Sequence, residues 1–104
     1  MADFVLLYSG GKMPETEEEQ GQVMKAWDAW FKEVGDAVKD AGNPFTPAAK
    51  TIGADGAVSD ASPQLSGYTI VKAGSLDEAT TIAKGSPVLQ GGASITIYET
   101  FEVM

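Results

Sequence analysis

The sequence predicts an α+β domain in which two helices cover one face of a four-stranded antiparallel sheet. Its 104 residues are enough for one hydrophobic core, so we expect a single domain that spans residues 1–104. Several stretches of strand length are rich in apolar, β-branched and aromatic residues. Two other stretches begin with helix-capping patterns and separate the strands into the order β-α-β-β-α-β.

The first strand and the first helix follow one another directly. Residues 4–8 form an apolar run that ends at Gly10-Gly11, which favours a strand over a helix. The segment Thr16-Glu17-Glu18-Glu19 fits a capping box, in which the threonine accepts a free backbone N–H and the last glutamate reaches back. Apolar residues then recur at helical spacing, at Val23, Trp27, Trp30, Phe31, Val34 and Val38. We expect Gly42-Asn43-Pro44 to end this helix after about 25 residues.

A hairpin is expected in the middle of the chain, where residues 50–52 and 57–59 flank Gly53-Ala54-Asp55-Gly56. Asp-Gly is typical of a tight turn between two strands, so this arm is expected to carry the second strand. Residues 67–72 predict the third strand because β-branched and aromatic side chains dominate them.

The last part of the chain predicts a short helix and a long strand. Ser75-Leu76-Asp77-Glu78 is a second capping box, and its helix is expected to end at Gly85. Residues 93–103 alternate between two sets of side chains and predict the final strand. The resulting βαββαβ order is that of the ferredoxin-like fold, which places both helices on one face of the sheet.

The first strand also predicts a homodimer. Helices on one face leave the other face uncovered, yet residues 4–8 have no polar side, as expected only for a strand buried on both faces. A second copy of the chain, packed sheet against sheet, is the economical cover for such a face.

Composition excludes several classes of function. The chain has no cysteine and no histidine, which removes thiol nucleophiles, disulfides, the commonest metal ligand and the usual near-neutral base. A net charge of −8 disfavours nucleic-acid and membrane partners. The start has no basic segment and too short an apolar run for a signal or a membrane span, so a cytoplasmic location is expected. We expect no metal, because the acids before and within the first helical turn complement the helix dipole. We also expect no cofactor.

The order of these motifs resembles the YCII-related proteins, in the branch named for an Asp-Gly-Pro-Phe motif. The resemblance rests on FVLLYSG in the first strand, a long helix with AW and F, VSD before LSGY, and SLDEA, and it covers nearly the whole chain. It implies a dimeric α/β barrel. Asp60 stands where the motif aspartate would, while Ala61-Ser62-Pro63 replaces Gly-Pro-Phe. The His–Asp pair of better-known members cannot form in a chain without histidine.

Asp60 is the candidate catalytic residue, with two interpretations that the sequence leaves open. It is either a general acid or base at a pocket, or a side chain that caps the turn at residues 60–63. The candidate ligand-binding residues are Tyr8, Tyr68, Ser66 and Trp27. The tyrosines, with Tyr98, could converge as hydroxyl donors, although tyrosine on a sheet is more often part of the core. One tryptophan off the main helical stripe could line a pocket wall.

These observations support three functional hypotheses. The first is a homodimer with a small-molecule pocket between helices and sheet and cofactor-free acid–base chemistry centred on Asp60, as the family resemblance implies. The second is a binding or accessory module that holds a metabolite without converting it, which the missing histidine favours. The third is an interaction scaffold, which a pocket lined by polar groups would argue against.

Overall fold

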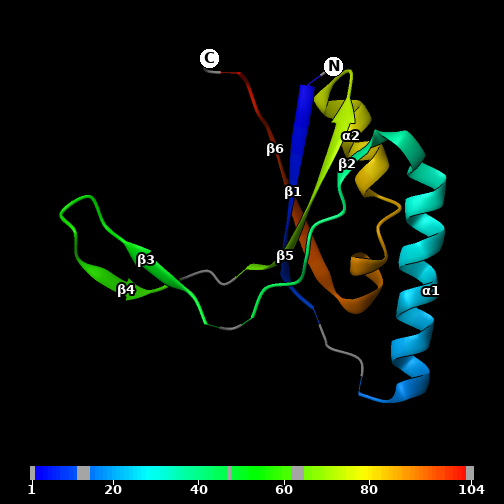
Figure 1. The fold of residues 1–104 in the computed structure, drawn as a ribbon, viewed down its shortest axis with the longest axis horizontal. Helices are drawn as coiled ribbons and strands as arrows, with labels where there is room; N and C mark the ends of the chain where they lie inside the picture. The colour runs from blue at the N-terminus through cyan, green and yellow to red at the C-terminus, as the bar shows by residue number, and fades with distance from the viewer. Residues whose placement is uncertain (1, 12–14, 47, 62–64, 103–104) are drawn as a thin grey trace.

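The computed structural model describes residues 2–11, 15–46, 48–61 and 65–102 (Figure 1). Its elements are β1 (Ala2–Gly10), α1 (Glu17–Val34), η1 (Gly35–Ala37), β2 (Val38–Asp40), β3 (Lys50–Ile52), β4 (Val58–Asp60), β5 (Leu65–Ala73), α2 (Leu76–Ala83), η2 (Pro87–Gly91) and β6 (Ala93–Glu99). Both η elements are 3-10 helices. The predicted α+β class is confirmed.

Four strands form one antiparallel sheet in the order β2-β5-β1-β6. The central strand β1 pairs with β5 on one side and β6 on the other, so that Leu7 lies opposite Tyr68 and Thr96. A separate two-stranded sheet joins β3 and β4. None of the helices in the described ranges is long and apolar enough to cross a membrane.

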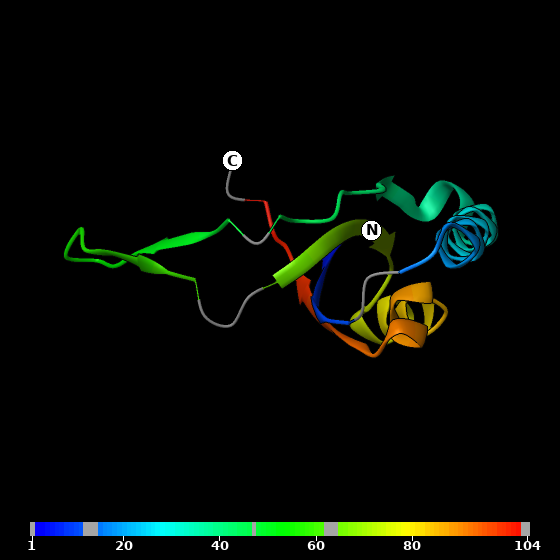
Figure 2. The ribbon, with the colours of Figure 1, turned by 90° about the horizontal axis from the view of Figure 1, so that it is seen from below.

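The hydrophobic core lies between the sheet and the two α-helices, which cover the same face of the sheet (Figure 2). Alternate residues of β1 point into it, so Phe4 and Leu6 are fully buried while Val5 and Leu7 are only partly buried. Helix α1 contributes the buried Trp30, whose indole N–H donates to the Ile82 carbonyl at 3.2 Å. This side chain ties α1 to α2 across the core.

Capping residues explain where both α-helices begin, as predicted. The Glu19 N–H donates to Thr16 Oγ1 at 3.1 Å, and the Glu78 N–H donates to Ser75 Oγ at 3.1 Å. Each glutamate carboxylate in turn accepts the backbone N–H of the residue before the cap, from Glu15 at 2.9 Å and from Gly74 at 3.2 Å. In both boxes the glutamate carboxylate therefore bonds the N–H of the residue before the N-cap and not the N–H of the N-cap residue.

The predicted end of the first helix is wrong. Helix α1 ends at Val34, because Gly35 adopts φ +62° and its N–H donates to the Phe31 carbonyl. Val38, which fits the helical spacing, belongs to β2 and lies opposite Val71 of β5. The second strand of the four-stranded sheet is therefore Val38–Asp40 and not the hairpin.

The hairpin itself is confirmed as a tight β3–β4 unit, here called the arm. Its turn is closed by the Gly53 N–H, which donates to the Ala57 carbonyl at 2.8 Å, and by the Ala57 N–H, which donates to Asp55 Oδ1 at 2.9 Å. The arm projects away from the body of the protein, on the side opposite the helices in both views (Figures 1 and 2).

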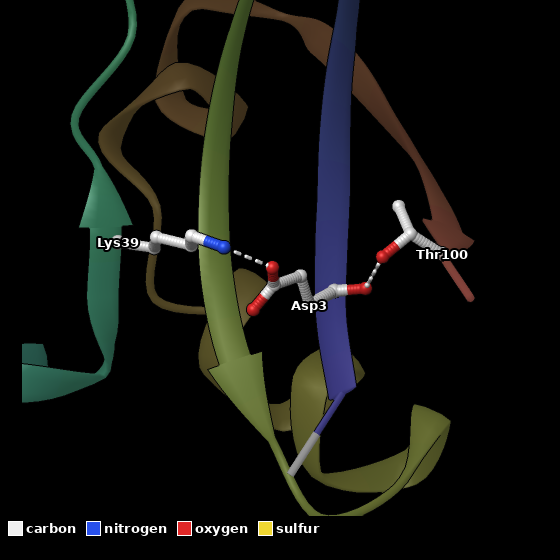
Figure 3. Close-up of polar contacts among 3 residues, drawn as sticks. All are labelled: Asp3, Lys39 and Thr100. Atoms are coloured by element: carbon white, nitrogen blue, oxygen red, sulfur yellow. Dashed lines mark hydrogen bonds and ion pairs between the residues drawn. The ribbon is translucent and has the colours of Figure 1, made fainter. Parts of the chain in front are cut away.

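The sheet face that points away from the helices is called the open face. By strand alternation and register it carries Val5, Leu7, Tyr68, Ile70, Thr96 and Tyr98. At one end Lys39 reaches across β5 to form an ion pair with Asp3 (Figure 3). The hydrogen bond and the charge of Asp3 raise the pKa of Lys39.

Beyond β6 the chain stays beside β1 for one more residue. The Thr100 N–H donates to the Asp3 carbonyl at 2.9 Å. The Thr100 hydroxyl donates to the same carbonyl at 3.0 Å (Figure 3). Strand β6 ends at Glu99, earlier than predicted, and the predicted end at Val103 lies outside the described residues.

Candidate functional site

A hollow of about 540 Å³ lies at the base of the arm and is here called the arm hollow. One side is the chain before the arm, with Pro44, Phe45 and Thr46, and the other includes Thr51 and the two residues that flank the arm, Ala49 and Ala61. The Ala61 N–H donates to the Ala49 carbonyl at 3.4 Å, and this bond connects the two ends of the arm. Leu65, at the start of β5, contributes a further apolar surface.

The turn after β2 positions the wall that contains Phe45. The Gly42 N–H donates to Asp40 Oδ1 at 2.8 Å, and Gly42 adopts φ +76°, a conformation that favours glycine. The following Pro44 forms an isolated antiparallel bridge with Gly67. The Phe45 N–H then donates to the Ser66 carbonyl at 2.9 Å, which fixes the segment against β5.

This placement stacks two aromatic rings on the open face. The rings of Phe45 and Tyr68 lie 5.7 Å apart between centroids, with an interplanar angle of 22°. Phe45 is 43% exposed and lines the arm hollow, while the Tyr68 hydroxyl donates to Asp40 Oδ2 at 3.5 Å. The stack therefore places the apolar ring surface of Phe45 next to the hydrogen-bonded hydroxyl of Tyr68 and carboxylate of Asp40.

Tyr8 and Trp27, two of the predicted ligand-binding residues, lie on the other side of the sheet. The Tyr8 hydroxyl donates to Thr69 Oγ1 at 2.6 Å, and Thr69 Oγ1 donates to the Ala41 carbonyl at 3.1 Å. Burial raises the pKa of Tyr8, which is 4% exposed. The Trp27 ring packs 5.9 Å from the Tyr8 ring. Tyr8 therefore belongs to the core, and the partly buried Trp27 packs against it.

The structure therefore separates the predicted site residues into two groups. Because Tyr8 lies opposite Gly67 in the register and its neighbour Leu7 lies opposite Tyr68, the two tyrosine rings point to opposite faces. Ser66 and Tyr68 are both near the arm hollow, Ser66 through its carbonyl bond to Phe45. The three tyrosines do not converge, because Tyr68 and Tyr98 lie on the open face and Tyr8 lies on the face that the helices cover.

Asp60 is the last residue of β4 and forms an ion pair with Lys50 at 2.6 Å. Its side chain is 84% exposed. Asp60 lies opposite Lys50 in the register, and the residues that follow each of them, Ala61 and Thr51, line the hollow. By strand alternation Asp60 therefore lies on the face of the arm away from the hollow. Part of the predicted turn at 60–63 lies outside the described residues, and both roles of Asp60 stay predictions.

A second, smaller hollow of about 170 Å³ lies on the helix side, between α2, η2 and β6. Thr80, Lys84, Leu89 and Ile97 are among its lining residues, and it contains none of the predicted site residues. Among the described residues, no group of three or more Asp and Glu side chains could hold a metal ion.

The sequence did not indicate Phe45 or Asp40 as site residues, nor the two threonines of the arm hollow, Thr46 and Thr51. Gly42-Asn43-Pro44 is typical of the end of a helix. That interpretation does not predict that the same residues turn the chain back along β5. An aromatic residue directly after such a turn is the one signal that could have pointed to the stack.

Comparison with known proteins supports the fold. No protein-family model and no curated protein matches the chain. Among solved structures, it is similar to 5-chloro-2-hydroxyhydroquinone dehydrochlorinase from Burkholderia phenoliruptrix AC1100 in complex with 2,5-dihydroxybenzoquinone, with a TM-score of 0.54 and 18% identity over 94% of this chain and 93% of that chain. At this identity the likeness shows the fold, and membership of the YCII-related family stays a prediction.

Proposed function

We propose that this chain is a YCII-like homodimer that binds a small, flat, oxygenated ring compound in the arm hollow. The observation that carries the proposal is the Phe45–Tyr68 stack at the edge of the hollow. In this proposal the second copy covers the open face, and each subunit supplies one ring-binding surface.

The open face supports the dimer. The four-stranded antiparallel sheet with both helices on one face supports a ferredoxin-like arrangement, whose sheets can pack face to face as a dimeric α/β barrel. Val5, Leu7 and Ile70 give this face an apolar centre, and Tyr98 at its edge is 57% exposed in the single subunit. Burying such a patch against a second copy removes it from water at a gain of about 25 cal/mol per Å².

The lining of the arm hollow supports the class of ligand. Phe45 offers an aromatic surface on which a planar ring can stack, and the hydroxyls of Thr46 and Thr51 can pair with oxygen substituents. Among the described lining residues none is charged, and a chain of net charge −8 repels anions. The enzyme with the similar fold was solved with a dihydroxybenzoquinone, a ligand of this shape.

The geometry favours binding over conversion within one subunit. A proton-transfer group must touch its substrate, either directly or through one water. Asp60 points away from the hollow, and Asp40 lies beyond the ring of Tyr68, where it accepts the tyrosine hydroxyl. We therefore propose a ring-binding module, with acid–base chemistry centred on Asp60 as the alternative.

The Phe45→Ala variant tests the ring-binding site. We expect affinity for hydroquinone, a flat dihydroxylated ring that is neutral at pH 7, to fall by between about 2-fold and 10-fold in calorimetry, since an aromatic pair contributes about 0.5–1.5 kcal/mol beyond buried area. The matched control is Leu89→Ala, because Leu89 is 40% exposed, close to the 43% of Phe45, and lines the smaller hollow. Equal affinity in Phe45→Ala and wild type, or a loss confined to Leu89→Ala, would contradict the assignment.

Asp60→Asn separates binding from acid–base chemistry. We expect the thermal midpoint to change little, because exposed ion pairs contribute at most about 1 kcal/mol, and we expect the affinity for the same probe to be retained. Asp55→Asn removes one charge from the same arm and serves as the control. Weaker probe binding in Asp60→Asn alone would indicate that the Asp60 carboxylate contacts the ligand, and it would favour the catalytic alternative.

A further inference from the structure

We propose that the arm is a clasp whose Ile52–Val58 face packs onto the second copy of the chain. This inference rests on the proposed homodimer and adds a second contact region to the sheet-to-sheet interface. It also assigns a role to the part of the chain that extends farthest from the body (Figure 1).

The two faces of the arm differ in chemistry. Ile52 and Val58 lie directly opposite one another in the register, on the same face as the Lys50–Asp60 ion pair. They are 70% and 62% exposed, a large fraction for side chains of this type. The other face carries the small polar pair Thr51 and Ser59. The two adjacent apolar side chains form a small exposed patch that a second surface can cover.

The arm also lacks the support that a hairpin needs. A two-stranded hairpin by itself is marginally stable in water, and three strands or packing against another element are required for independent stability. In the described residues β3 and β4 pair only with each other, as a sheet separate from the main one. A surface of the second copy can provide the element against which this hairpin packs.

The direction of the arm points to the second copy as its occupant. The arm leaves the body on the side opposite the helices, which is the side of the open face (Figure 2). A second copy that packs on the open face therefore lies beside the arm.

Charge points to the same occupant. In a chain with 15 acids and 7 bases, most surfaces of two copies repel one another. The open face carries charges of both signs, with Lys39 and Lys72 beside Asp3, Asp40 and the nearby Glu102. The arm face adds the neutral Lys50–Asp60 pair. These two surfaces can therefore meet a copy of the same chain with little of that repulsion, whereas they offer no excess of positive charge for a nucleic acid.

Docking of the arm couples assembly to ligand binding. The arm and its base carry Ala49, Thr51 and Ala61, which form one wall of the arm hollow. Contact with a second copy fixes that wall in place, so the ring ligand and the second copy strengthen each other's binding.

Lysine substitutions on the two faces of the arm test the clasp. Val58→Lys and Ile52→Lys are expected to raise the dimer dissociation constant at least ~10-fold in sedimentation equilibrium, because burying an unpaired ammonium opposes association. Ser59→Lys adds the same charge to the opposite face of the arm and is expected to dimerise like the wild type. Circular dichroism checks the fold, which should persist because both apolar side chains are mainly exposed in the subunit.

The outcomes separate the arm from the dimer. A wild-type dimer whose Val58→Lys and Ile52→Lys variants associate like Ser59→Lys would overturn the clasp and leave the dimer in place. A wild-type chain that is monomeric at every concentration would overturn both. Loss of dimer in the two apolar-face variants alone would establish that this face of the arm contacts the second copy.

Discussion

Leu6→Lys is expected to unfold the protein, whereas Leu7→Lys is expected to leave a folded monomer. Leu6 is fully buried under the helices, so its replacement buries an unpaired ammonium at a cost of several kcal/mol, comparable with the whole stability of a small domain. Leu7 lies on the open face and is only partly buried, so a lysine there can remain in water once the second copy is lost.

Circular dichroism and sedimentation equilibrium together distinguish these two results. Val23→Lys, at a 40% exposed position of α1, is the control and is expected to keep both fold and mass. A folded Leu6→Lys variant with the wild-type midpoint would contradict the position of the core. A Leu7→Lys variant that remains a dimer would show that the open face is not the interface.

Gly42→Ala is expected to destabilise the protein and to weaken ring binding at the same time. A Cβ at this position would lie 1.7 Å from the Tyr68 carbonyl oxygen, and Gly42 already adopts φ +76°. The backbone must move away from β5, which disrupts the segment that places Phe45 on Tyr68. We expect a loss of more than about 2 kcal/mol in unfolding free energy, measured by urea denaturation.

Gly56→Ala provides a matched control for this prediction. Gly56 has a similar φ of +86°, but a Cβ there meets nothing within 4 Å. Its replacement therefore reports the conformational strain alone, at roughly 1–2 kcal/mol. If Gly42→Ala lost no more stability than Gly56→Ala, the close approach of the turn to β5 would not constrain the site as described.

Local signals predicted the parts of the fold that depend on a few adjacent residues. Both helix starts follow from capping side chains, at Thr16 and Ser75, and the hairpin follows from Asp55-Gly56. The end of α1 could not be predicted in the same way, because Val38 continues the helical spacing although it pairs with Val71 in the sheet. Apolar spacing alone does not distinguish a residue of the helix from one of the next strand.

The candidate site was predicted less well, because it depends on contacts between distant segments. Which face Tyr8 and Tyr68 occupy follows from the pairing of Leu7 with Tyr68, and no local pattern gives that register. Phe45 reaches the site through a bond between its N–H and the Ser66 carbonyl, 21 positions away along the chain, in a segment without periodicity. Asp60 was singled out by its position before the turn that contains Pro63 and by family resemblance, and neither carries information about the side of the arm on which its carboxylate lies.

The mass of the wild-type protein in solution tests the central claim most directly, since the proposed homodimer covers both the open face and the arm with a second copy. Sedimentation equilibrium over a range of micromolar concentrations should give twice the chain mass of 10.9 kDa. A mass of 10.9 kDa at every concentration would mean that the apolar open face stays in water, and it would contradict the homodimer and the clasp together.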